Sequence, residues 1–166
     1  MARKKKNQVV SNIRHLIAKL NPKSPISEQF RTLRTNLQFA SVDEEVQTLL
    51  ITSSSPGEGK SSTTANLAIV YAQAGKKVLL VDADLRKPTV HYTFRMNNLK
   101  GLSNILVGDI TIPEAITSDS GIEGLDVISS GPIPPNPSEL LGSKRMEKFI
   151  EDVKEVKFSF LEKPPA

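Results

Sequence analysis

The sequence has 166 residues, with 22 Lys or Arg against 18 Asp or Glu, so its formal net charge is +4. This length corresponds to about one domain and is long enough to bury a core, which excludes several full domains. The absence of cysteine excludes disulfide scaffolds, thiolate metal sites and cysteine nucleophiles, and it suits a reducing, cytoplasmic compartment.

Positive charge is concentrated at the start of the sequence. The first 34 residues contain nine basic side chains and one acid, Glu28, whereas the rest contains 13 basic and 17 acidic residues. We expect residues 1–23 to form a basic arm with a short helix and residues 24–166 to form one domain. Three lysines at 4–6 are typical of a solvated terminus, and contact with anionic lipid is the alternative. The arm has no interleaved aromatic residues, which argues against a nucleic-acid partner.

Hydropathy predicts neither a membrane span nor a secretory leader. The apolar runs are only a few residues long, far below the roughly 20 needed to cross a bilayer. The basic start of the sequence leads into no apolar segment of the kind that signal peptides carry. We therefore expect a chain that does not cross a membrane by itself.

Helical and strand patterns alternate in the first half of the sequence. Apolar residues at helical spacing over 13–20 predict a short amphipathic helix, which the following prolines end. A second helix is predicted to begin after Ser27, as its N-cap, and to run to about residue 40. The pattern then predicts a β-rich run over residues 46–52 and a turn-rich loop over 53–60. An Ala-rich helix that ends at a glycine follows over 61–75, and a second apolar strand over 76–84.

This alternation of strand and helix favours an α/β fold, in which a parallel sheet is flanked by helices on both faces. The second half of the sequence has weaker patterns. They predict a loop over residues 85–98, short helices over 102–107 and 113–117, and a weak strand over 125–129. Ser138 and Ser143 are predicted to cap two further helices, the second of which runs through residues 145–156.

The strongest functional motif is the loop between the first predicted strand and the Ala-rich helix. It reads S-x-P-G-E-G-K-S, the pattern of a phosphate-binding loop with Ser54 at the place of the first glycine. Its glycines let successive N–H groups point at phosphate, Lys60 can reach the β- and γ-phosphates, and Ser61 offers a hydroxyl to Mg²⁺. The alternative is a glycine-rich turn with a surface lysine. The candidate nucleotide-binding residues are Ser55, Pro56, Gly57, Glu58, Gly59, Lys60, Ser61 and Ser62.

A second motif, V-L-L-V-D-A-D-L-R-K-P, places two acids after an apolar strand. Open α/β sheets bind their ligands at the carboxyl ends of such strands. Residues two apart share one face of a strand, so we expect Asp82 and Asp84 to point the same way and to hold Mg²⁺ or orient an attacking hydroxyl. Arg86 and Lys87 follow as candidate phosphate contacts. The alternative is a pair of acids that end a strand in solvent.

These two motifs together resemble those of a known family. P-G-E-G-K-S followed by V-D-A-D-L-R-K-P resembles the bacterial tyrosine kinases of capsular and exopolysaccharide synthesis, which are relatives of the MinD-type ATPases. The similarity also covers an E-x-x-R-x-x-R helix, the segment G-L-S-N-I-L-V-G-D and the segment G-P-I-P-P-N-P-S-E-L-L. Glu28, Arg31 and Arg34 form the first of these.

The resemblance implies a MinD-like P-loop fold and an ATP-dependent, autophosphorylating protein-tyrosine kinase that uses Mg²⁺. It implies that Lys60 binds phosphate and that Ser61 binds the metal. Asp82 becomes the candidate base or metal organiser, and Asp84 helps to hold Mg²⁺. The predicted catalytic residues are therefore Lys60, Asp82 and Asp84, and the predicted metal ligands are Ser61, Asp82 and Asp84.

The resemblance also implies partners. It predicts a membrane-protein activator of polysaccharide export that acts through its cytoplasmic tail, and tyrosine-containing protein substrates. Glu28, Arg31 and Arg34 are expected to make subunit contacts in a ring-shaped oligomer. Such a protein would be cytoplasmic and would associate with the membrane through its partner.

Two alternatives stay open. MinD-type ATPases carry a lysine five residues before the P-loop lysine, and Ser55 at that place favours the kinase over a MinD- or ParA-like ATPase switch. The family also implies a third strand that ends in Asp-x-Pro-Pro, where this sequence has Glu162 at the place of the aspartate, and a tyrosine-rich tail that this sequence lacks. The second alternative is therefore a catalytically inactive kinase fragment, incomplete at the C-terminus, whose sheet would be poorly stable.

Overall fold

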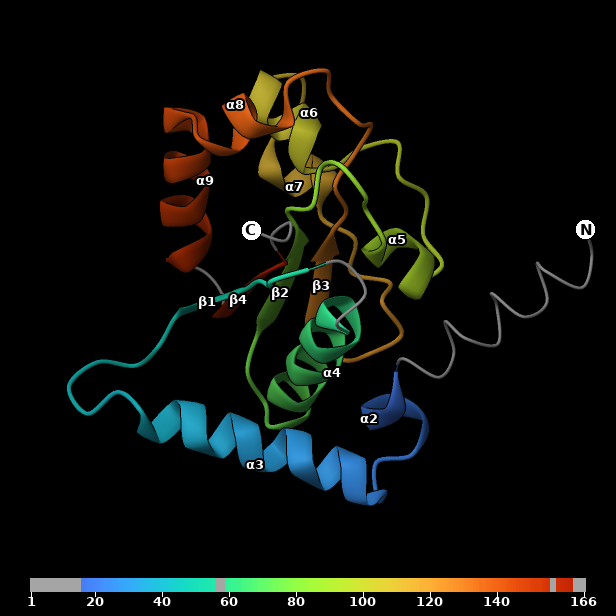
Figure 1. Ribbon diagram of the computed structural model, residues 1–166, viewed down its shortest axis with the longest axis vertical. Coiled ribbons are helices and arrows are strands. Elements are labelled where there is room, and N and C mark those ends of the chain that lie inside the picture. Colours follow the sequence, from blue (N-terminus) through green and yellow to red (C-terminus); the bar gives the residue numbers. More distant parts are fainter. Residues whose placement is uncertain (1–15, 56–58, 156–157, 163–166) are drawn as a thin grey trace, which may run out of the picture.

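In the described part of the chain, four parallel strands form the central sheet, which Figure 1 shows among the helices. The structure, a computed structural model, describes residues 16–55, 59–155 and 158–162. The strands lie in the order β1-β4-β2-β3, and their bounds are β1 (Thr48–Ile51), β2 (Val78–Asp82), β3 (Leu125–Ile128) and β4 (Phe158–Glu162). Each neighbouring pair is parallel, which confirms the predicted α/β fold class.

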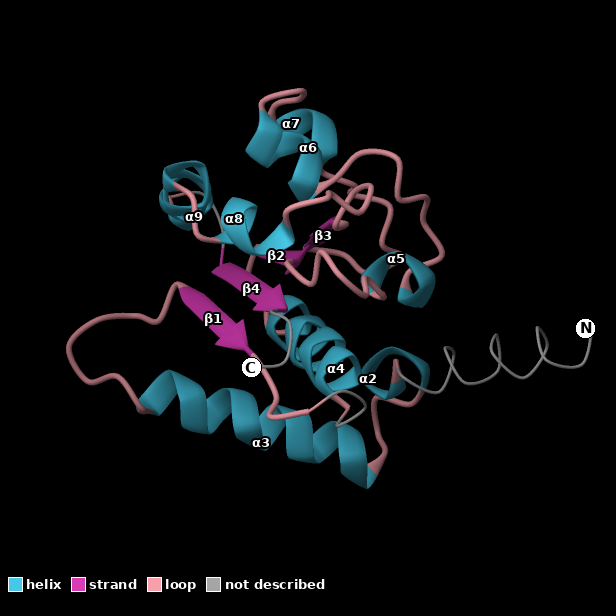
Figure 2. Cartoon of the chain, turned by 45° about the horizontal axis from the view of Figure 1, so that its top comes forward, coloured by secondary structure: helices cyan, strands magenta, loops and turns pink. Residues whose placement is uncertain are grey.

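Helices cover both faces of this sheet (Figure 2). The described helices are α2 (Ile17–Leu20), α3 (Pro25–Phe39), α4 (Lys60–Gln73), α5 (Val90–Thr93), α6 (Leu102–Val107), α7 (Ile112–Ala115), α8 (Pro137–Leu141) and α9 (Lys144–Lys154). One group, α2, α3 and α4, lies on one face of the sheet, and α6 to α9 lie on the other.

Strand β2 separates two hydrophobic cores. All five of its residues are buried. Val78 and Leu80 point into the core that contains α4, whereas Leu79 and Val81 point into the core that contains α6 and α9. This alternation follows from the two-residue period of a strand, and a continuous apolar run is typical of a strand that is covered on both faces.

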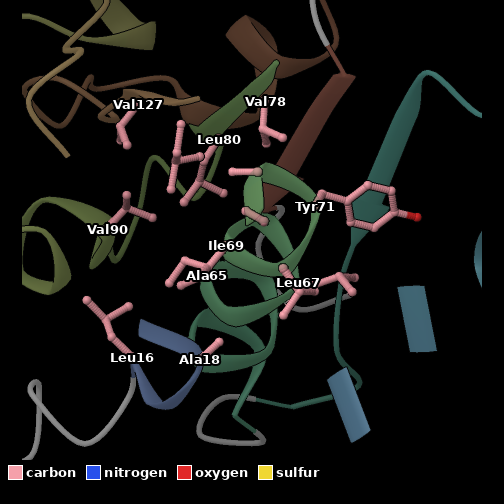
Figure 3. Packing of buried hydrophobic residues seen from close by; sticks show 14 residues of the cluster. Leu16, Ala18, Ala65, Leu67, Ile69, Tyr71, Val78, Leu80, Val90 and Val127 are labelled. Atoms are coloured by element: carbon pink, nitrogen blue, oxygen red, sulfur yellow. The ribbon is translucent and has the colours of Figure 1, made fainter. Parts of the chain in front are cut away.

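Helix α4 is the centre of the first core (Figure 3). Nine consecutive residues, Thr64 to Ala72, are buried, because the helix packs between the sheet, α3 and α2. The short helix α2 contributes Ala18 to the same core, and its N-cap residue contributes Leu16. The backbone of Ala18 is held at both ends, since its N–H donates to Asn66 Oδ1 (3.0 Å) and its carbonyl accepts from Gln73 Nε2 (3.0 Å). Helix α2, which the sequence places in the basic arm, thus packs directly on α4.

Helix α3 begins earlier than predicted. Ser24, not Ser27, is its N-cap, and the Ser24 hydroxyl accepts from the N–H of Ser27 (3.1 Å). Pro25 occupies the first helical position, where its fixed φ suits a helix and its missing N–H costs nothing. The hydroxyl of Ser27 is fully buried and donates instead to the carbonyl of Asn21 (2.7 Å). The predicted N-cap at Ser27 is therefore wrong.

Two other predictions for the second half need correction. Helix α5 lies inside the segment predicted as a loop over 85–98. Helix α8 begins at Pro137, so Ser138 lies within its first turn and is not its cap. Ser143 does cap α9, and its hydroxyl accepts from the N–H of Met146 (3.3 Å), as predicted.

A helix that spans a membrane must be both long enough and apolar enough to cross the bilayer. In residues 16–55, 59–155 and 158–162, no helix meets both requirements. The longest, α3, has 15 residues and carries several charges.

Two phenylalanines provide a test of the second core. Phe149 of α9 is 2% exposed in this core, and we expect Phe149→Ala to lower the free energy of unfolding by about 3–5 kcal/mol, because it leaves a cavity. Phe39 at the end of α3 is 79% exposed, so Phe39→Ala should change it by less than about 0.5 kcal/mol. Urea unfolding curves would measure both. Equal losses for the two variants would show that α9 does not pack on the sheet.

Candidate functional site

The candidate site lies where β1 and β2 end and α4 begins. The loop after β1 leads to Gly59, whose φ of +78° is in the left-handed region that glycine adopts without strain. Helix α4 then starts at Lys60 and continues for 14 residues, and the dipole of a helix makes its N-terminus favourable for an anion. Pro56, Gly57 and Glu58 lie outside the described residues, so the predicted loop is seen here through Ser55 and the segment from Gly59 onward.

The first two site residues that the structure brings together are Lys60 and Asp84. The ammonium Nζ of Lys60 lies 3.3 Å from Oδ2 of Asp84, and the two side chains are only 8% and 10% exposed. Largely buried charges are costly unless they are paired, and this contact gives each of the two groups an oppositely charged partner. The predicted phosphate-binding lysine and one predicted magnesium ligand are therefore in direct contact.

Asp82 is fully buried at the end of β2, and backbone N–H groups surround its carboxylate. Oδ1 accepts from the N–H of Asp84 (3.0 Å), and Oδ2 accepts from the N–H groups of Thr89 and Val90 (3.1 Å each). These bonds fold residues 84–90 into a loop over the carboxylate. Asp82 thus fixes the loop that follows its own strand.

Asp84 lies in this loop and not in the strand. Because β2 ends at Asp82, the alternation of strand side chains does not decide where Asp84 points. Its Oδ1 accepts from the N–H groups of Arg86 (3.3 Å) and Lys87 (3.0 Å), a local turn typical of aspartate, while Oδ2 faces Lys60. The two acids reach the site by different routes.

Two contacts of the 84–90 loop involve residues that the sequence did not single out as ligands. The hydroxyl of Thr89 lies 2.9 Å from that of Ser61, in the first turn of α4. The guanidinium of Arg86 donates to the hydroxyl of Ser138 in α8 (2.7 Å). Each contact joins residues that are far apart in the sequence, 28 positions for Thr89 and Ser61 and 52 for Arg86 and Ser138, so only the folded chain reveals them.

Beyond Thr89, the loop enters α5, where His91 and Tyr92 are adjacent. Their ring centroids are 4.0 Å apart, and Tyr92 is 62% exposed. Burial lowers the pKa of His91 below its ordinary value, so its imidazole is neutral at pH 7. His91 therefore adds no positive charge to this end of the loop at neutral pH.

The strand that the family resemblance implies, with Glu162 at the place of the aspartate, is present as β4. It lies between β1 and β2, and the backbone of Glu162 pairs in register with Ile51 on one side and Asp82 on the other. The carboxyl ends of β1, β4 and β2 therefore meet at one edge of the sheet, as the general rule for ligand sites in α/β folds requires. The sequence position that corresponds to the expected aspartate thus lies next to Asp82 along the sheet.

The E-x-x-R-x-x-R residues lie on α3, away from this edge of the sheet. Arg31 pairs with Glu28 on the same helix (Nε to Oε1, 3.0 Å) and also donates to the carbonyl of Pro22. Arg34 donates to the carbonyl of Val70 in α4 (2.7 Å). Near this contact, burial raises the pKa of Tyr71 and the charge of Arg34 opposes that shift. All three predicted oligomerisation residues are thus present on one helix, with contacts inside the chain.

The site has the chemistry that a nucleotide and a magnesium ion require. A helix N-terminus and the ammonium of Lys60 suit phosphate oxygens. The hydroxyl of Ser61 and the carboxylates of Asp82 and Asp84 are hard oxygen donors, which Mg²⁺ prefers. The residues present therefore fit both groups.

Comparison with known proteins supports this fit. Residues 49–163 match the family described as the CobQ/CobB/MinD/ParA nucleotide binding domain. The tyrosine-protein kinase YwqD of Bacillus subtilis is 54% identical over 145 residues, which cover 87% of this chain and 61% of YwqD. The chain thus spans less than two thirds of the length of that relative.

Two further proteins resemble the chain over most of its length. CapB of Staphylococcus aureus, which is assigned to the same class of kinases, is 43% identical over 166 residues, covering 99% of this chain and 70% of CapB. The crystal structure of the chimerical protein CapA2B2 shares 49% identity with a TM-score of 0.87, covering 92% of this chain and 67% of the chimera. The chain therefore belongs to the bacterial tyrosine-protein kinases, within the CobQ/CobB/MinD/ParA nucleotide-binding family.

Proposed function

We propose that the chain binds Mg-ATP at the N-terminus of α4 and acts as a protein-tyrosine kinase in capsular or exopolysaccharide biosynthesis. The observation that carries this proposal is the buried contact of Lys60 with Asp84, at the start of a helix that follows a phosphate-binding loop. ATP supplies the phosphoryl group, and Mg²⁺ neutralises the charge that develops on it. The family to which the chain belongs supports this reaction.

The residues of the site have different roles in this proposal. Lys60 exchanges Asp84 for phosphate oxygens, so its ammonium is paired before and after nucleotide binds. Asp84 is then released from the ammonium and can help to hold the cation together with Ser61. Backbone N–H groups occupy both oxygens of Asp82, which supports the role of an organiser of the loop more than that of a base for the tyrosine hydroxyl.

Partners follow from the same family. The similar chimera CapA2B2 combines, by its name, a CapA part with a CapB part. We infer that this chain likewise works with a membrane-protein activator, through the activator's cytoplasmic tail, and associates with the membrane through it. Tyrosine-bearing proteins are its substrates, and Glu28, Arg31 and Arg34 lie on the surface helix proposed for assembly into a ring.

Kinase activity can be tested directly. The chain is incubated with Mg-ATP, the activator's cytoplasmic tail and a Glu-Tyr copolymer, and phosphotyrosine is measured. Lys60→Ala should lower the rate by about two orders of magnitude or more, because the charge that stabilises the transferring phosphoryl group is lost. Lys77→Ala, an exposed lysine before β2, should keep the wild-type rate.

Two results would contradict the kinase assignment. Phosphotyrosine formation by Lys60→Ala at the wild-type rate would show that the site does not perform the transfer. Release of inorganic phosphate without phosphotyrosine would instead favour a MinD-like ATPase switch, the alternative that Ser55 disfavours.

The organising role of Asp82 leads to a prediction about stability. Asp82→Asn replaces one acceptor oxygen with an NH₂ donor that faces backbone N–H groups, so the free energy of unfolding should fall by about 1–3 kcal/mol without nucleotide. Asp119→Asn, at an exposed aspartate, should leave it within about 0.5 kcal/mol of wild type. Chemical unfolding in EDTA measures both. A stable Asp82→Asn variant would show that the carboxylate does not hold the loop.

A further inference from the structure

Thr89 and Ser61 are 28 residues apart in the sequence, but their hydroxyl oxygens lie within 2.9 Å of each other. Ser61 belongs to the first turn of α4, beside Lys60. Thr89 is the residue just before α5, on the loop that Asp82 holds. This contact links the phosphate-binding helix to the loop after β2.

The backbone of Thr89 is fixed on both sides. Its N–H donates to Oδ2 of the fully buried Asp82 (3.1 Å). Its carbonyl accepts from the N–H groups of Tyr92 and Thr93 (3.1 Å each), which form the first turn of α5. A side chain on so constrained a backbone presents its hydroxyl in a defined place, which is the requirement for positioning another group.

The chemistry of a metal-bound hydroxyl indicates what this contact can do. A serine that binds a cation uses an oxygen lone pair, and its O–H proton then needs an acceptor on the side away from the metal. Oγ1 of Thr89 lies at hydrogen-bond distance and can accept that proton. With the proton so placed, the lone pairs of Ser61 are left to the cation.

We propose that Thr89 is a positioning residue for magnesium: it accepts the proton of the Ser61 hydroxyl and so orients the Ser61 oxygen towards the cation. The inference rests on the proposed function, because it assigns Thr89 to the same Mg-nucleotide site. It adds to the P-loop a residue from the loop after β2, which the phosphate-binding motif does not contain. Asp82 takes part indirectly, since it holds the backbone of Thr89.

The test measures how strongly magnesium improves nucleotide binding, without any turnover. The Kd of ADP is determined in excess Mg²⁺ and in EDTA, and the ratio of the two is the magnesium enhancement. For Thr89→Val, which keeps the shape and removes the hydroxyl, we expect the enhancement to fall about five- to tenfold. The Kd in EDTA should stay within about twofold of wild type, because the phosphate contacts of Lys60 and α4 are unchanged.

Two matched variants control for changes in the loop. Thr89→Ser keeps the hydroxyl and should retain the wild-type enhancement. Thr93→Val removes a hydroxyl from the same segment, one that donates to the carbonyl of Thr89 and not to Ser61, and it should also retain the enhancement. These results would show that the loss of magnesium enhancement comes from the missing hydroxyl of Thr89 and not from a less stable α5.

Several results would overturn the proposal. An unchanged enhancement in Thr89→Val would show that the hydroxyl does not act on the cation. An equal weakening of ADP binding with and without Mg²⁺ would show a purely structural role. Wild type that binds ADP in a Lys60-dependent way but without magnesium enhancement would remove this inference and keep the nucleotide site, whereas wild type that binds no ADP would overturn the proposed function itself.

Discussion

The carboxylate of Asp82 is the group on which the arrangement of the site depends. It is fully buried at the end of β2, where an ionised acid is costly unless donors surround it. The donors are backbone N–H groups of the 84–90 loop, so the loop must fold over the acid to satisfy it. The same loop carries Asp84 to Lys60 and Thr89 to Ser61. One carboxylate thereby determines where both contacts with α4 form.

The pairing of Lys60 with Asp84 explains how a largely buried ammonium is tolerated at this place. Removing the partner of a buried charge is strongly destabilising, but replacing one anion by another is not. The N-terminus of α4 attracts either anion through its dipole. If nucleotide binds here as proposed, phosphate oxygens would replace Asp84 at an ammonium that stays paired.

The sequence predicted the elements whose signals are local. The apolar run of β2, the P-loop pattern before α4 and the Ser143 cap of α9 each lie within a few residues. Ser24 and Ser27 are both good N-cap residues on either side of Pro25, and only the burial of Ser27 against Asn21 selects the first. The contact between Thr89 and Ser61 spans 28 residues, so no local pattern could reveal it.

Helix α4 also connects α3 with the site. Arg34 donates to the carbonyl of Val70 in α4, and Lys60 begins the same helix ten residues earlier, about 15 Å away along its axis. Glu28 is 65% exposed and Arg31 26% exposed, whereas Arg34 reaches across to α4 inside the chain. Of the three residues proposed for assembly, Glu28 and Arg31 are therefore the more accessible to a neighbour. Arg34 thus attaches α3 to the helix that begins at Lys60, so the surface helix and the phosphate-binding lysine are joined through α4.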